Sequence, residues 1–225
     1  MRAFFCLLLP CLAFADAPTT SKEGLQSLHD LVGTWKGTGT SFGSREDQTK
    51  GFWSETIACE WRFDKNDVRM RFAFEKSKIF EAAELRYDPA AKSYRLAAET
   101  TDGKKETYAG ELEGKTLSLL HEEGATAKRM VFTFLHSNRF LYRVESKAQG
   151  KTTFAKLFQV GATKEGVPFV AGDGKPECIV SGGLGSMPVM FRGRTYYVCC
   201  SGCRDEFNAE PEKYVKEFEA KKAKK

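Results

Sequence analysis

Residues 57–74 read IACEWRFDKNDVRMRFAF, and no other segment of the chain indicates β structure as directly. Every second residue from Ile57 to Phe63 is apolar, and the same alternation runs from Val68 to Phe74. Successive side chains of a strand point to opposite faces, so a period of two predicts strands with one buried face. The polar residues 65–67 predict a turn between them. The segment is therefore expected to form an antiparallel hairpin.

The same rhythm continues on both sides of this hairpin. Further alternating runs include Met130–Phe134 and Phe140–Val144, and turn signals such as Asp102-Gly103 separate the runs. Counting them gives about ten strands joined by short connections. Such an up-and-down meander closes into a barrel, because closure removes the exposed edge strands. We therefore predict a mainly β fold, with an antiparallel barrel of about ten strands over residues 18–160 and large side chains, mostly Phe, facing inward.

Different patterns flank the predicted strands. Leu25, Leu28 and Leu31 have helical spacing and predict a short helix before the first strand. Residues 161–173 are rich in Gly and polar side chains and predict a linker. Because few contacts are expected across a linker, we expect residues 18–163 to fold on their own.

The first fifteen residues have the pattern of a secretory signal. Met1-Arg2 precedes an apolar run that ends at Leu12, and Ala13-Phe14-Ala15 offers the small residues that precede a signal-peptidase cut. We expect cleavage after Ala15 and a secreted or periplasmic protein. The apolar run is too short to span a bilayer as a helix, and no later segment is long enough, so the protein is not expected to be transmembrane. Lipid attachment at Cys11 and an uncleaved apolar strand are the alternatives.

Composition and charge narrow the function classes. The 225 residues are 41% hydrophobic and 29% charged, enough for one sizeable core with an appendage or for two small domains. The net charge of +5 becomes +4 when Arg2 leaves with the signal, and four lysines lie in the basic tail 221–225. No basic patch is interleaved with aromatic residues, so nucleic-acid binding is not expected. No catalytic motif is present, and an enzyme is not expected.

Cysteine usage points to the chemistry. Seven cysteines become five once Cys6 and Cys11 leave with the signal. Cys59 stands alone at an inward strand position and is expected to be an inert core residue. The other four lie together in the segment 174–220, namely Cys178, Cys199, Cys200 and Cys203. Three histidines lie far from this segment and from one another in the sequence, at His29, His121 and His136, so no shared histidine site is expected.

The predicted elements of the C-terminal segment gather these thiols. Residues 188–198 predict a hairpin that ends at Cys199, and Ser201 is expected to cap a helix carrying Cys203. A helix N-terminus lowers thiol pKa values and so favours thiolates. Thiolates are the ligands that soft ions such as zinc and copper prefer, and Cys200 and Cys203 form a C-x-x-C pair typical of zinc sites. A soft-metal site is therefore predicted.

Two other interpretations of the cluster remain open. Clustered cysteines in an exported protein often form disulfides. Adjacent Cys199 and Cys200 pair with each other only under strain, which counts mildly against this interpretation. The segment is alternatively a domain that has lost its metal.

The barrel segment resembles a known architecture over residues 25–160. Gly33-Thr34-Trp35 looks like the G-x-W start of lipocalin-like barrels, in which the Trp packs across the closed end of the barrel. The hairpin from Tyr87-Asp88-Pro89 to Tyr94 is similar to one in bacterial barrels of the fatty-acid-binding and nitrobindin-type group. Some nitrobindin-like proteins hold haem through a histidine, and no histidine here matches that role. The resemblance implies the fold and says little about function.

The C-terminal segment resembles the TRASH/YHS family of small metal-associated domains. The matching residues are Cys178, Tyr196 to Cys203, Phe207 and Pro211 to Tyr214. The resemblance implies a treble-clef-like α+β fold and places the metal ligands on Cys178, Cys199 and Cys203. Ser181 stands where some relatives have a further cysteine, so the fourth ligand is left open between Cys200, Asp205 and water.

Two functions from different classes follow from this sequence. In the first, the protein captures, carries or senses a soft ion, zinc or copper, outside the cytoplasm, in exchange with another metal-handling protein. In the second, the barrel binds an apolar small molecule, and the cysteine segment is a structural appendage. A barrel core filled by its own side chains has the same sequence pattern, so the sequence alone leaves both functions open.

Overall fold

A computed structural model describes residues 18–43, 45, 48, 51–65, 67–166 and 176–223. The predicted signal, residues 1–15, lies outside the described residues. So do residues 167–173 of the predicted linker and the last two residues of the basic tail.

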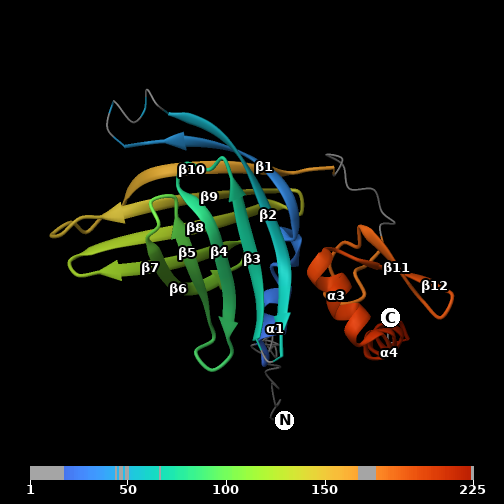
Figure 1. Ribbon diagram of the computed structural model, residues 1–225. Coiled ribbons are helices and arrows are strands. Elements are labelled where there is room, and N and C mark those ends of the chain that lie inside the picture. The colour runs from blue at the N-terminus through green and yellow to red at the C-terminus, as the bar shows by residue number, and fades with distance from the viewer. Residues whose placement is uncertain are drawn as a thin grey trace, which may run out of the picture.

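Ten antiparallel strands form a closed barrel (Figure 1). Each strand pairs with the next one in the sequence, and β1 pairs with β10 to close the sheet. The strands are β1 Gly33–Ser41, β2 Phe52–Asp64, β3 Asp67–Glu75, β4 Phe80–Asp88, β5 Ser93–Thr100, β6 Lys105–Glu113, β7 Thr116–Glu123, β8 Thr126–His136, β9 Arg139–Lys147 and β10 Ala155–Lys164. The predicted fold class and number of strands are confirmed.

The hairpin predicted at residues 57–74 is β2 and β3, with Ile57 opposite Phe74 and Phe63 opposite Val68. Alternate residues of β2 are buried, as the period of two requires. The interior is largely aromatic. Its buried rings include Trp35, Trp61, Phe72, Phe80, Tyr108, Phe132, Phe140, Tyr142 and Phe158.

A short helical segment closes one end of the barrel. Helix α1 (Ser21–Gln26) begins with a capping box between Thr20 and Glu23, and the 3₁₀ turn η1 (His29–Leu31) follows it. The predicted leucines of this segment are buried, as a lid over the barrel requires. The indole Nε1 of Trp35 donates to the carbonyl oxygen of Leu31 at 2.7 Å, which fixes the ring across this end. The predicted helix and the predicted place of Trp35 are confirmed.

The predicted boundary at residue 160 is wrong, because β10 continues to Lys164. The sequence pattern places Gly161 at the start of the linker. In the barrel it is a strand residue that pairs with Thr38 on one side and Leu141 on the other. A Cβ there would lie 3.4 Å from the Leu141 side chain, an ordinary contact distance. Sheet pairing on both sides outweighs the weak strand propensity of glycine.

The described residues 176–223 form a second part, here called the C-terminal module. It contains the hairpin β11 (Met187–Phe191) and β12 (Arg194–Val198), followed by α3 (Ser201–Ala209) and α4 (Pro211–Lys222). Arg192 and Gly193 both have positive φ at the hairpin turn, the conformation that two-residue hairpin turns of type I′ need. Pro211 occupies the first turn of α4. The predicted hairpin and last helix are confirmed.

The predicted cap of α3 is wrong. Cys200 is the N-cap residue, and its side chain makes no capping hydrogen bond. Ser201 is the first helical residue, and its hydroxyl donates instead to the carboxylate of Glu60 in β2 at 2.8 Å. The hydroxyl thus links the helix to the barrel.

The C-terminal module packs on the free edge of β2 (Figure 1). Strand β1 pairs with β2 only as far as Cys59, so the backbone of Trp61 is left for another partner. Its N–H donates to the sulfur of Cys200, and Gly202 lies against its carbonyl oxygen. The expectation of few contacts between the two parts is therefore wrong: an unpaired strand edge is covered by the start of a helix.

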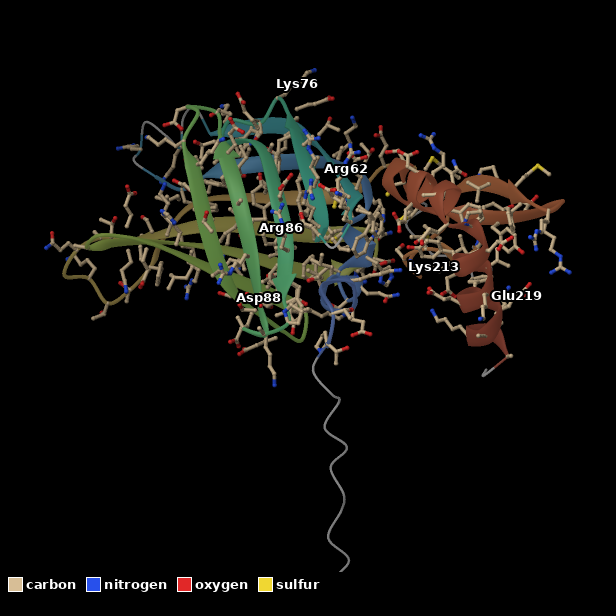
Figure 2. All side chains as sticks on the ribbon, turned by 60° about the horizontal axis from the view of Figure 1, so that its bottom comes forward. Arg62, Lys76, Arg86, Asp88, Lys213 and Glu219 are labelled. Atoms are coloured by element: carbon tan, nitrogen blue, oxygen red, sulfur yellow. The ribbon has the colours of Figure 1, made fainter. Side chains whose placement is uncertain are left out.

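Charged side chains mark the outer surfaces of both parts. Figure 2 shows Arg62 on the side of the barrel nearest the C-terminal module, and Lys213 and Glu219 on the module itself. The guanidinium of Arg62 is bonded to Glu60, the same carboxylate that accepts from Ser201. None of the helices in the described part of the chain has the length and hydropathy that a membrane crossing requires.

Candidate functional site

Three of the predicted ligands meet in the C-terminal module. The sulfurs of Cys178, Cys199 and Cys203 all lie within 4.8 Å of one another, and those of Cys199 and Cys203 are 3.5 Å apart. Cys178 precedes the hairpin, Cys199 follows β12, and Cys203 is in the first turn of α3. Three separate elements thus direct one sulfur each to the same point.

A tight loop brings Cys178 to this point. Its N–H donates to the carbonyl of Gly183 at 2.6 Å, and its carbonyl accepts from the N–H of Gly182 at 2.8 Å. Gly182 has a φ of 76°, a conformation that a residue with a side chain rarely adopts. Cys178 also forms a parallel bridge with Tyr197 of β12. The loop is therefore fixed to the strand that carries the next ligand.

Ser181 supports two of the three sulfurs. Its N–H donates to the sulfur of Cys178 at 3.4 Å, and its hydroxyl lies 3.4 Å from the sulfur of Cys199. The sequence indicated Ser181 only as the place of a missing cysteine. Its position in the pattern could have indicated a role at the site, because a residue that replaces a ligand still faces the site and hydrogen-bonds to the sulfurs.

Cys200 and Asp205, the two side chains considered beside water as a fourth ligand, lie differently. The sulfur of Cys200 is 3.9 Å from that of Cys199, but it also accepts the N–H of Trp61 at 3.4 Å. Asp205 is exposed and forms an ion pair with Arg204. Cys200 is thus close to the cluster and bonded to the barrel, whereas Asp205 faces solvent.

The four thiols influence one another's protonation. The pKa values of Cys178 and Cys200 are lowered, and the largest cause for each is hydrogen bonding with the neighbouring thiol of Cys199. The pKa of Cys203 is raised, chiefly by burial. The pKa of Cys199 is raised, chiefly by its hydrogen bond to Cys178. Hydrogen bonds among the four sulfurs thus shift their pKa values in opposite directions, and sulfur donors of this kind suit a soft ion.

The remaining candidate residues are not among the three converging sulfurs. Cys59 is a buried free thiol of β2, and burial raises its pKa, as expected of an unreactive core residue. All five described cysteines are free thiols. His29 bonds to the carbonyl of Gln26 and His121 to that of Thr107.

A second site lies at the end of the barrel opposite α1. A cavity of about 480 Å³ opens there among the ends of the strands. A volume of this size is within the range of small-molecule sites. The walls are mostly apolar, with aromatic rings from β2, β4 and β10. The residues that line it are Ser41, Gly43, Trp53, Lys78, Ile79, Phe80, Thr100, Glu106, Tyr108, Lys128, Val144, Leu157 and Phe158.

Two buried carboxylates organise the polar groups of the barrel interior. Glu106 lines the cavity and accepts hydrogen bonds from Lys128 and Tyr108. Glu55 is 2% exposed and accepts from the indole of Trp53 at 2.8 Å and from the hydroxyl of Tyr142 at 2.7 Å. Sequence patterns did not single out these groups. One partner of each carboxylate lies on the same strand, but Tyr142 and Lys128 come from other strands.

Comparisons with known proteins add little to this geometry. The chain matches no protein-family model and no curated protein. Among solved structures it is similar to the S-type phycobiliprotein lyase CPES from Guillardia theta, with 9% identity, a TM-score of 0.42, and coverage of 64% of this chain and 94% of that one. It is also similar to EF1p2_mFAP2b bound to DFHBI, with 13% identity, a TM-score of 0.25, and coverage of 62% and 98%. At these values neither structure indicates what this chain binds.

Proposed function

We propose that this protein binds a soft metal ion, zinc or copper, through Cys178, Cys199 and Cys203. The observation that carries the proposal is the convergence of these three sulfurs within 4.8 Å. Cys178 and Cys203 are 1% and 0% exposed, so an ion there would be shielded from water on most sides. Thiolate sulfur in such a place favours zinc or copper(I) over hard cations.

The helix and the loop supply the supporting charges. Cys203 lies at the N-terminus of α3, whose unpaired N–H groups favour negative charge nearby. The N–H of Ser181 supports the sulfur of Cys178. Since the metal-bound form carries thiolates, each of these donors stabilises that form more than the protonated one.

Metal analysis of the full-length protein tests the proposal. Reduced protein titrated with Zn²⁺ or copper(I) should bind about one ion per chain. Cys178→Ser and Cys203→Ser should each lose most of the affinity, and Cys59→Ala should keep it. Equal binding by all three variants would show that the ion sits elsewhere. Thiols found oxidised in pairs in the exported protein would favour the disulfide interpretation.

A second candidate function is the binding of an apolar small molecule in the barrel. The observation that favours it is the cavity of about 480 Å³, whose walls include Trp53, Phe80 and Phe158. The fluorescent probe N-phenyl-1-naphthylamine, which is neutral and apolar, tests it. Val144→Trp should fill the cavity and abolish the fluorescence gain, while Leu120→Trp on the exposed surface should not. Equal binding by both variants would contradict this function.

With the metal function we propose a place outside the cytoplasm and exchange of the ion with another metal-handling component. The support is the signal-like pattern of residues 1–15. The intact mass of protein recovered from the extracytoplasmic fraction should correspond to a chain that begins at Asp16. A mass that retains residues 1–15, or that includes a lipid at Cys11, would contradict this.

A further inference from the structure

A cleft between the C-terminal module and the barrel reaches the cysteine cluster at Cys199. The cleft has a volume of about 580 Å³. Of the four clustered cysteines in the described part of the chain, Cys199 alone lines it. Cys178 and Cys203 are fully buried, and Cys200 is buried against Trp61. Any group that reaches the cluster from this side therefore meets Cys199 first.

The two walls of the cleft come from different parts of the chain. One wall is the closed end of the barrel, with Val32, Gly33 and Thr34, together with Lys164, Glu165 and Gly166 at the end of β10. The other wall is the loop Leu184 to Ser186. The volume suits a small molecule and is too small for a folded domain.

A fixed positive charge lies in the barrel wall. The amino group of Lys164 donates to the carbonyl oxygen of Asp30 at 2.8 Å and lies 5.1 Å from the centre of the Trp35 ring. These contacts hold the side chain at the cleft. Glu165 in the same wall is paired with Lys36, so the positive charge of Lys164 attracts small anions, including thiols that carry carboxylates.

We propose that a soft ion enters and leaves the cluster through this cleft by exchange between Cys199 and a small anionic thiol carrier. This rests on the proposed metal function. On entry, a bond from the ion to a carrier sulfur breaks as the bond to Cys199 sulfur forms. The proton of Cys199 passes to the departing carrier thiolate, and the ion keeps its oxidation state. Cys178 and Cys203 then replace the remaining carrier ligands. Each carrier ligand leaves as a thiol where the cysteine that replaces it gives up a proton, and as a thiolate where that cysteine is already deprotonated.

A tryptophan placed in the barrel wall tests the route. Thr34 and Thr38 are both on β1 and, four residues apart, face the same side of the sheet. Thr34 lines the cleft, whereas Thr38 does not. Thr34→Trp should narrow the cleft without touching the cysteines, and Thr38→Trp is its matched control.

The measurement uses the full chain and Cd²⁺, whose bonds to thiolates give an ultraviolet charge-transfer band. Glutathione serves as the carrier for loading and release. Thr34→Trp should slow both rates by about tenfold or more and leave the equilibrium affinity unchanged, since a narrower passage raises only the barrier. Thr38→Trp should match the unmodified protein. Equal rates for the two variants, or a changed affinity in Thr34→Trp, would overturn the route.

A second measurement needs no variant. In the metal-free reduced protein, N-ethylmaleimide should modify Cys199 before Cys178 and Cys203, as peptide mass spectrometry can show. Modification of a buried sulfur first would overturn the route. Absence of the cadmium band at equilibrium in the unmodified protein is a different result, because it would reject the metal function itself.

Discussion

The backbone N–H of Trp61 donates to the sulfur of Cys200 at 3.4 Å, although the two residues are 139 positions apart. This contact joins the barrel to the residue next to the proposed metal ligands. This hydrogen bond uses one of the lone pairs through which the sulfur of Cys200 could otherwise bind a metal ion. The hydrogen bond from Trp61 therefore affects whether Cys200 can serve as the fourth metal ligand.

The first prediction concerns that ligand. We expect Cys200→Ser to keep about one Cd²⁺ per chain with less than a tenfold loss of affinity, because the three converging sulfurs remain. Cys203→Ser should lose about a hundredfold or more, on the order of 3 kcal/mol. Competition with a chromophoric chelator measures both. Equal losses in the two variants would make Cys200 a fourth ligand.

The second prediction concerns the packing of α3 on β2. A side chain at Gly202 would place its Cβ 1.8 Å from the carbonyl oxygen of Trp61, so the helix would have to move away. Gly202→Ala should destabilise the protein by about 1–3 kcal/mol in urea unfolding. The exposed Asn208 on the same helix gives the control, and Asn208→Ala should change stability by less than about 0.5 kcal/mol. Similar values for both variants would mean that the close contact is absent.

The third prediction concerns the buried carboxyl of Glu55. Tyr142→Phe removes one of its two hydrogen-bond donors and should cost about 1–3 kcal/mol of stability. The loss should be smaller in a Glu55→Gln background, because the two groups interact directly. A double-mutant cycle should therefore give a coupling energy of about 0.5 kcal/mol or more, and additive effects would contradict the contact.

The fourth prediction concerns acid stability. Burial alone would raise the pKa of Glu106, but hydrogen bonds from Lys128 and Tyr108 outweigh it and hold this pKa below its ordinary value. The unfolded chain then binds the proton more readily than the folded one. The stabilisation from Glu106 is present above the ordinary pKa of 4.5 and is lost as pH falls through the lowered value.

Glu106→Gln should accordingly make stability fall less steeply below about pH 4.5 than in the unmodified protein. Urea midpoints at a series of pH values measure this slope. Glu111→Gln, an exposed position on the same strand, is the control and should leave the slope unchanged. A variant at Glu106 that follows the unmodified curve would contradict the prediction.

Local sequence patterns predicted the barrel well, because each of its hairpins is formed by two strands that follow each other directly in the sequence. The alternation of apolar and polar residues from Ile57 to Phe74 predicts both strands and the register in which they pair. Gly161 misled the prediction for a physical reason: glycine is a frequent linker residue, and only its two strand neighbours show that it belongs to the sheet.

The candidate site was less accessible to sequence reasoning. The spacing of Cys178, Cys199 and Cys203 indicated a common centre, and the structure brings their sulfurs together. The contacts of Cys200 with Trp61 and of Ser201 with Glu60 join positions far apart in the chain. The periodicity of neighbouring residues cannot indicate a contact between distant positions. The interface between the barrel and the C-terminal module therefore cannot be predicted from such patterns.

The pairing of β1 with β10 also has a consequence for the order of folding. Every other pair of neighbouring strands in the barrel is a local hairpin, and local hairpins form quickly. The β1–β10 seam, where Trp35 meets Lys164, can form only after the intervening chain has collapsed, because closing so long a loop is entropically costly. The free edge of β2 that receives α3 lies beside the start of β1. We expect the seam to be the slow step of folding, and the cysteines to take their final places only after it has closed.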